Sequence, residues 1–225
     1  MSEQGRVRVF LVDDHPIVRH GLAKLLAAEP DIEVCGEAAD ARSALEGIAT
    51  SSPDVVLVDI SLGGASGIDL IREAKALAPK AASLVVSMHD ELLFAERALR
   101  AGALGYVVKQ EAVEVIVRAV RAVAAGEIFV SEAVASRIVG RLRAGGGQVG
   151  SALESLSDRE LNVLSLIGRG LGTREIAECL HISVKTVESY RERLKEKMNL
   201  RSGSELVRYA VRWADAAEGR DDEDD

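Results

Sequence analysis

Two hydrophobic patterns follow one another along the chain, and in the first of them strands alternate with helices. Up to about residue 125, short apolar runs typical of buried strands are separated by stretches with helical periodicity. The predicted strands cover residues 7–12, 32–37, 55–58, 84–87 and 105–108, and the predicted helices cover 16–28, 41–49, 67–77, 90–100 and 112–125. Elements that alternate in this way form a parallel sheet covered by helices on both faces. The first pattern therefore predicts a flavodoxin-like, doubly wound (βα)5 domain.

The second pattern, beyond residue 126, is helical throughout. Residues 132–143 have helical periodicity and lead into the glycine-rich segment 145–150, which is typical of a flexible linker. Ser157 and Glu160 then have the spacing of a capping box, which marks the start of a new helix and a new domain. The four helices predicted for that domain cover residues 157–167, 173–180, 183–198 and 204–213.

These patterns divide the chain into four parts. We predict an α/β domain over residues 1–126, a linker with a helical part over 127–152, a small all-α domain over 153–213 and an acidic, disordered tail over 214–225. The formal net charge is −8, but the tail alone carries −6 and the all-α domain carries +2. The acidic total therefore does not exclude DNA binding by the all-α domain.

Composition adds expectations about location and redox state. No apolar run approaches the roughly 20 residues that span a bilayer, and the first residues lack the apolar core of a signal peptide. We therefore expect a cytoplasmic protein without a membrane partner. Cys35 and Cys179 stand in apolar segments of different domains, and we expect buried free thiols at both positions.

The residues that can carry chemistry in the α/β domain stand at the carboxyl ends of its predicted strands. Asp13 and Asp14 follow the first strand, Asp59 follows the third, Ser87 ends the fourth and Lys109 follows the fifth. In the strand order 2-1-3-4-5, the first and third strands flank the point where the order reverses, which is where such sheets bind ligands. The three carboxylates should converge there. Because crowded carboxylates repel one another, this oxygen-rich pocket predicts a bound Mg²⁺ or Mn²⁺.

The same pocket suits the chemistry of an aspartyl phosphate. A metal ion can neutralise charge while Asp59 attacks phosphorus and becomes phosphorylated. Lys109 adds a compact positive charge beside the phosphoryl group, and the hydroxyl of Ser87 can hydrogen-bond one of its oxygens.

This constellation resembles the receiver domain of bacterial two-component response regulators, over about residues 6–125. The resemblance implies that Asp59 is the phosphoacceptor and that Ser87 and Lys109 contact the phosphoryl group. It also implies that Ser87 and the aromatic Tyr106 move together as a switch. The metal ligands that it implies are the carboxylates of Asp13, Asp14 and Asp59 and the backbone carbonyl of Ser61.

The all-α domain has the pattern of a helix-turn-helix. Only residues 181–182 separate two of its predicted helices, and Thr173 and Ser183 are placed to cap their N-termini. The second helix of the pair should pack on the domain core through Val184, Val187, Tyr190, Leu194 and Met198. The N-terminal part of such a helix reads bases in the major groove, which nominates Lys185, Glu188, Ser189 and Glu192. The residues that suit DNA phosphates are Arg191, Arg193, Lys195 and Lys197.

Short stretches of this domain closely resemble the LuxR-type helix-turn-helix: residues 156–160 (LSDRE), 175–177 (EIA), 186–188 (TVE) and 197–198 (KM). Together with the receiver, the chain is similar to the NarL/FixJ family over nearly its whole length. Thr173 and Thr186 complete the predicted DNA-binding set. The last helix places Leu206, Tyr209, Ala210 and Trp213 on one side, as core, as a dimer surface of the kind seen in relatives, or as a mixture of both.

These observations predict a transcription regulator rather than an enzyme. A sensor histidine kinase would phosphorylate Asp59, and a phosphorylated homodimer would bind paired half-sites on double-stranded DNA. The receiver would catalyse only its own phosphorylation and dephosphorylation. Two alternatives stay open: a DNA-binding regulator that does not respond to phosphate, and a hydrolase that works through an aspartyl phosphate.

Overall fold

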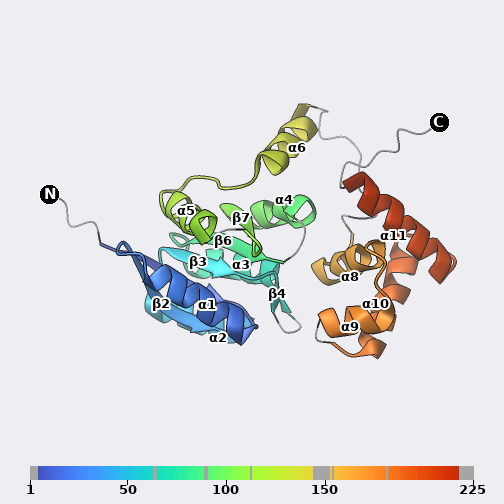
Figure 1. Ribbon diagram of the computed structural model, residues 1–225, viewed down its shortest axis with the longest axis horizontal. Coiled ribbons are helices and arrows are strands. Elements are labelled where there is room, and N and C mark those ends of the chain that lie inside the picture. The colour runs from blue at the N-terminus through green and yellow to red at the C-terminus, as the bar shows by residue number, and fades with distance from the viewer. Residues whose placement is uncertain are drawn as a thin grey trace. The chain divides into compact units, whose positions relative to one another are not determined.

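The computed structural model describes residues 5–62, 65–88, 91–111, 113–143, 153, 155–180 and 182–217. The chain divides into two compact units, Met1–Arg143 and Ala144–Asp225 (Figure 1). The glycine-rich segment 145–150 and the tail beyond residue 217 lie outside the described residues. Within the described ranges, no helix has both the length and the apolar character that crossing a bilayer requires.

A five-stranded parallel sheet forms the centre of the first unit. Its strands are β1 (Val7–Val12), β2 (Ile32–Ala38), β3 (Val55–Val58), β6 (Ala82–Ser87) and β7 (Gly105–Val108). They lie in the order β2-β1-β3-β6-β7, which confirms the order predicted for the five strands. Strand β3 is buried along its whole length because helices cover both faces of the sheet.

Five helices follow the strands in turn: α1 (Pro16–Ala27), α2 (Ala41–Ser51), α3 (Gly67–Leu77), α4 (Glu91–Ala101) and α5 (Val113–Ala124). Apolar residues of α1 and α5, such as Leu26 and Val120, pack with Leu11 and Leu57 of the sheet in one core cluster. Helices α2, α3 and α4 contact one another in sequence order along the other face. This layering leaves the carboxyl ends of the strands open for a site.

A small hairpin after β3 was not predicted. Strands β4 (Ser61–Leu62) and β5 (Ala65–Ser66) pair antiparallel just before α3 begins. The Ser66 hydroxyl caps α3 by accepting hydrogen bonds from the backbone N–H groups of Ile68 and Asp69. The hairpin and the cap together lead the chain from the end of β3 into α3.

The segment after α5 returns to the sheet and covers the outer edge of β7. The Tyr106 N–H donates to the Phe129 carbonyl, and the Phe129 N–H donates to the Leu104 carbonyl, each at 2.9 Å. Helix α6 (Glu132–Arg143), the helical part of the predicted linker, then packs against α4. The start of the predicted linker is therefore attached to the first unit.

The second unit contains α8 (Asp158–Gly168), α9 (Thr173–Cys179), α10 (Val184–Lys197) and α11 (Gly203–Ala217). The capping box at the start of α8 is confirmed, with both of its hydrogen bonds between Ser157 and Glu160 present. Ser183 caps α10 as predicted. Thr173, however, is the first residue of α9 rather than its cap, because the backbone of Gly172 occupies the cap position and its N–H donates to Glu175.

Three burial predictions for side chains need correction. Cys179 is exposed and Cys35 is half-buried, although both are free thiols as expected. Val184, the first residue of α10, is also exposed, at 40%. Periodicity shows which residues share a helix face, but it does not show how far along the helix that face is covered.

Candidate functional site

The ends of the parallel strands bring the predicted pocket together. The backbone ladder continues one residue past the strands, because the Asp59 N–H donates to the Val12 carbonyl and the Lys109 N–H donates to the Ser87 carbonyl, both at 2.9 Å. These bonds place Asp13, Asp59 and Lys109 side by side at the carboxyl edge of the sheet. Their side chains are almost fully buried, with Asp59 itself only 4% exposed.

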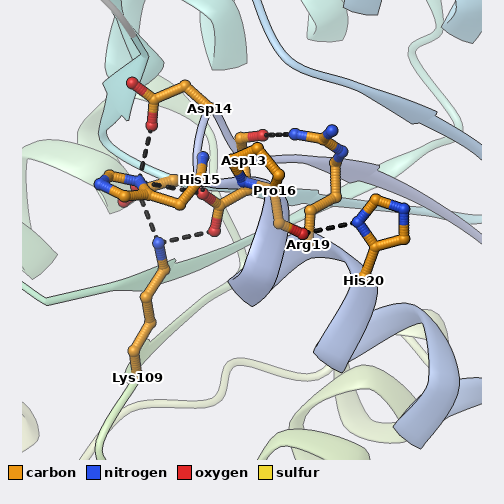
Figure 2. Close-up of polar contacts among 8 residues, drawn as sticks. Asp13, Asp14, His15, Pro16, Arg19, His20 and Lys109 are labelled. Atoms are coloured by element: carbon orange, nitrogen blue, oxygen red, sulfur yellow. Dashed lines mark hydrogen bonds and ion pairs between the residues drawn. The ribbon is translucent and has the colours of Figure 1, made fainter.

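Lys109 joins two of the acidic residues. Its ammonium nitrogen lies 2.6 Å from Asp13 Oδ2 (Figure 2). The same nitrogen lies 2.8 Å from Asp59 Oδ2. Burial by itself would lower the pKa of Lys109, but the charges of Asp59 and Asp13 outweigh burial and raise that pKa above its ordinary value. Lys109 therefore stays protonated and offsets part of the negative charge of the pocket.

The Asp59 carboxyl is destabilised as an anion by its surroundings. Burial raises the pKa of Asp59, and the nearby charge of Asp13 raises it further, while Lys109 and a hydrogen bond from the Ser87 hydroxyl work against the rise. A desolvated carboxylate with a fixed cation beside it is the arrangement expected of a nucleophile or of a metal ligand.

Three further predicted residues lie close to this pocket in sequence or along the sheet. Ser87 is fully buried at the end of β6. Tyr106 is buried in β7, in register with Val85 of β6. Ser61 begins β4, two residues after Asp59, and the role of its carbonyl as a metal ligand stays a prediction.

His15, which follows the two aspartates in the loop after β1, also belongs to the pocket. His15 Nδ1 lies 2.8 Å from Asp14 Oδ1 and 3.3 Å from Asp13 Oδ1 (Figure 2). One potential ligand atom from each of Asp13, Asp14, His15 and Asp59 lies within 4.8 Å of the others. The four side chains are thus close enough to share one cation after small movements.

Two positioning residues of the pocket were missed by sequence reasoning. A Cβ atom on Gly67 would lie 2.0 Å from the Asp59 carbonyl oxygen, so only glycine lets α3 start against the backbone of Asp59. Arg19 donates from Nη1 to the Asp13 carbonyl at 2.6 Å, and its Nε lies 3.4 Å from Glu37. Gly67 follows a serine cap, but no local sequence signal reveals that the helix start touches Asp59.

In the second unit, α10 presents its polar side chains outward. Lys185, Glu188 and Ser189 are exposed in its first two turns, where base contacts were predicted. Thr186 is bonded within the cap, since its hydroxyl lies 2.7 Å from that of Ser183. The guanidinium of Arg193 lies over the Tyr190 ring, 6.0 Å from its centre, at the outer limit of a cation–π contact.

The comparisons with known proteins agree with this geometry. The model of the response regulator receiver domain matches residues 9–121, and the model of the bacterial regulatory proteins of the luxR family matches residues 154–210. The oxygen regulatory protein NreC of Staphylococcus carnosus is 34% identical over 211 residues, which cover 92% of this chain and 97% of that protein. The transcriptional regulatory protein MctR of Rhizobium johnstonii is 36% identical over 211 residues, 94% of this chain and 96% of that protein.

A solved structure is similar over the same length. RcsB from Salmonella enterica serovar Typhimurium, bound to the promoter rprA in the presence of the phosphomimetic BeF3−, aligns with a TM-score of 0.57 and 26% identity. The alignment covers 92% of this chain and 98% of RcsB. This chain belongs to the NarL/FixJ family of two-component response regulators.

As a response regulator, the chain pairs a receiver with a LuxR-type DNA-binding domain and is a two-component transcription regulator. In that DNA-binding domain, two of the predicted phosphate contacts are already paired. Lys195 Nζ lies 2.8 Å from Glu192. Lys197 Nζ lies 2.6 Å from the buried Glu160 carboxylate and 2.9 Å from the Ser155 carbonyl. Lys197 therefore ties the end of α10 to the start of α8.

The predicted dimer surface of this response regulator needs a partial correction. Leu206 and Ala210 are completely buried in the core of the DNA-binding domain. The physical reason is the close crossing of α8 and α11, where a Cβ on Gly168 would lie 2.6 Å from the Ala210 carbonyl oxygen. Tyr209 and Trp213 are half-buried, and their place in a dimer stays a prediction.

Proposed function

We propose that Asp59 accepts a phosphoryl group from a sensor histidine kinase and that phosphorylation controls DNA binding by α10. The observation that carries the proposal is the pocket itself, in which a buried carboxylate lies 2.8 Å from a lysine ammonium and within 4.8 Å of other acidic ligand atoms. The two-domain composition of the chain and the DNA-bound, phosphomimetic state of the similar RcsB support it.

In the proposed reaction, a carboxylate oxygen of Asp59 attacks phosphorus and forms an O–P bond. The bond between phosphorus and the donor breaks, and its electron pair leaves with the donor group. Lys109 holds its charge beside the phosphoryl oxygens, and the Ser87 hydroxyl donates a hydrogen bond to one of them. Hydrolysis of the acyl phosphate later returns the carboxylate and inorganic phosphate, so the receiver acts only on itself.

The residues of the pocket fit a divalent cation. The carboxylates of Asp13, Asp14 and Asp59 and the carbonyl of Ser61 would hold it, and oxygen donors of this kind suit Mg²⁺ or Mn²⁺. When bound, such an ion supplies positive charge next to the transferring phosphoryl group.

The output step would be DNA binding by two copies of the chain in the cytoplasm. We infer that phosphorylation favours a homodimer whose two α10 helices occupy paired half-sites. Joining two half-sites raises affinity through effective concentration without new contacts for each domain. Ser87, buried at the end of β6, and Tyr106, buried within β7, would carry the change away from the pocket.

The test uses acetyl phosphate as donor and the full chain. We expect wild type and Asp69→Asn, an exposed carboxylate on α3, to be labelled once per chain on a phosphate-affinity gel. Asp59→Asn should not be labelled. Labelling of Asp59→Asn at the wild-type level would refute Asp59 as the phosphoacceptor.

DNA binding is the second readout. Genome-wide footprinting with and without phosphodonor should find sites that fill only when donor is present. Equal occupancy by wild type and Asp59→Ala under both conditions would favour the regulator that does not respond to phosphate. Turnover of unrelated phosphomonoesters by the purified chain would favour the hydrolase instead.

A further inference from the structure

The imidazole ring of His15 lies against the acidic pocket, and the backbone of the same residue is bonded to Asp13. Its backbone N–H donates to Asp13 Oδ1 at 2.9 Å, and Pro16 follows it in the first turn of α1. Because Pro16 disfavours the helical backbone at the residue before it, His15 stays extended at the N-cap of α1, directly after Asp13 and Asp14. Figure 2 shows the ring beside both carboxylates.

The oxygens of the pocket are divided between Lys109 and His15. Lys109 contacts Oδ2 of Asp13 and Oδ2 of Asp59. His15 Nδ1 faces the other oxygen of Asp13, Oδ1, and Oδ1 of Asp14. A cation placed next to Nδ1 therefore reaches two carboxylates without displacing the lysine.

The distances are compatible with one shared ion. Nitrogen and oxygen donors lie about 2.0 to 2.2 Å from a first-row divalent ion. The four ligand atoms of the pocket lie within 4.8 Å of one another, and His15 Nδ1 is nearer than that to both Asp13 and Asp14. Four atoms at such distances lie at most about 2.9 Å from a common centre, so each has to move by less than about 1 Å to bind one ion.

We propose that His15 is a nitrogen ligand of the proposed metal site, which makes the pocket select transition-metal ions such as Mn²⁺ and Co²⁺ over Mg²⁺. The inference rests on the metal site of the proposed function. Mg²⁺ takes oxygen ligands almost exclusively, whereas a site that includes an imidazole also binds first-row transition ions, with an affinity that rises from Mn²⁺ to Co²⁺. The ion takes the place of the Nδ1 proton, and the ring keeps its remaining proton on Nε2, which water can reach because the side chain is 41% exposed.

The decisive measurement is pulsed electron paramagnetic resonance on the full chain loaded with Mn²⁺. Wild type should show modulation from a directly bound ¹⁴N nucleus, and His15→Ala should lose it. His20→Ala is the matched control, because His20 lies on α1 and contacts the Pro16 carbonyl rather than the carboxylates. A nitrogen signal that survives in His15→Ala, or no signal in wild type, would overturn the proposal.

Calorimetric titration separates a ligand from a residue that only orients Asp14. Loss of an orienting partner weakens metal binding by roughly 10- to 100-fold for every ion. We expect His15→Ala to weaken Co²⁺ and Mn²⁺ binding by at least that factor and to leave Mg²⁺ binding nearly unchanged. An equal loss for Mg²⁺ and Co²⁺ would mean that His15 only orients Asp14, and the proposal would be wrong.

The two proposals fail in different ways. If acetyl phosphate labels Asp59 with Mg²⁺ present but Mn²⁺ shows no nitrogen ligand, His15 is not a ligand and the proposed function stands. If Asp59 is never labelled, the proposed function fails, while the Mn²⁺ spectrum still decides the role of His15.

Discussion

The pocket of the receiver and the outer face of α10 are built in opposite ways. The pocket gathers Asp13, Asp59 and Lys109 from three distant segments, buries them and pairs them with one another. The face of α10 takes its polar residues from one continuous helix and leaves them exposed. Changes in the pocket should therefore disturb several partners at once, whereas changes on the helix face should act independently.

The largest expected effect is a loss of receiver stability in Gly67→Ala. The added methyl group would meet the Asp59 carbonyl oxygen at 2.0 Å, and because backbone cannot give way cheaply, the end of β3 or the start of α3 must shift. We expect the receiver to lose about 3 kcal/mol of unfolding free energy. Calorimetric melting measures this as a lower receiver transition.

Gly140→Ala on α6 is the control for Gly67→Ala, since a Cβ there meets nothing within 4 Å. Alanine favours a helix interior over glycine, so this variant should keep or slightly raise the melting temperature. Equal melting temperatures for the two variants would show that α3 does not press on Asp59.

The next largest effect is on DNA affinity and comes from the exposed face of α10. Lys185→Ala removes an exposed cation from the first turns of α10, and we expect DNA binding to weaken by about 2 kcal/mol, roughly 30-fold. Lys80→Ala, an exposed lysine of the receiver, should bind DNA like wild type. Fluorescence anisotropy with an operator found by footprinting measures both, and unchanged affinity in Lys185→Ala would remove α10 from base readout.

Lys197→Met tests an exception on α10. Unlike the other polar residues of that helix face, Lys197 is paired with a buried carboxylate from a distant segment. Its ammonium pairs with the buried carboxylate of Glu160, so its loss should destabilise the DNA-binding domain by about 1 to 2 kcal/mol. That figure is below the usual cost of breaking a buried pair, because the Lys197 side chain is 38% exposed. Urea unfolding measures it. A salt dependence of DNA binding that falls by about one phosphate contact, with stability unchanged, would contradict this assignment.

The same pair predicts a pH dependence. Burial by itself would raise the pKa of Glu160, but hydrogen bonds from Lys197 and Ser157 outweigh it and lower that pKa below its ordinary value of 4.5. A lowered folded-state pKa gives stability that is complete above the ordinary value and is lost as the pH falls through the folded-state value. Wild type should therefore lose more stability than Glu160→Gln on acidification below about pH 4.5, as followed by circular dichroism during urea unfolding.

The smallest expected effect is an increase in the stability of the receiver, in Asp59→Asn. Because burial and Asp13 raise the pKa of Asp59, the ionised carboxylate costs stability at neutral pH. Asp59→Asn removes that cost while Lys109 keeps its contact with Asp13. We expect a modest rise in the urea midpoint of the receiver at pH 7 in metal-free buffer. A fall in that midpoint would mean that Asp59 is mainly a structural partner of Lys109.

The sequence predicted the parts of this molecule that depend on order along the chain. Strand ends can be read from apolar runs, and parallel strands put those ends at one edge, so Asp13, Asp59, Ser87 and Lys109 could be brought together in advance. Gly67 and His15 could not, because the first matters through a clash with distant backbone and the second through the direction of its ring.

What the sequence left open in the DNA-binding domain has a related cause. Periodicity shows which residues share a face of a helix but not which neighbour covers that face. Leu206 and Ala210 were therefore left between core and dimer surface until the crossing of α8 and α11 placed them in the core. The pairing of Lys197 with Glu160, 37 residues away, could not be inferred from charge patterning within α10.

The short segment around Phe129 has a consequence for how the receiver avoids misassembly. A sheet that ends in an unpaired strand offers its backbone as a template on which other chains can add strands and aggregate. Here Phe129 accepts a hydrogen bond from the Tyr106 N–H and donates one to the Leu104 carbonyl, so the chain pairs the first part of its own edge strand β7. Gly105 makes this pairing possible, because a side chain there would meet the Phe129 carbonyl oxygen at 2.9 Å. A second copy of this receiver therefore cannot add a strand along the start of β7 without displacing Phe129.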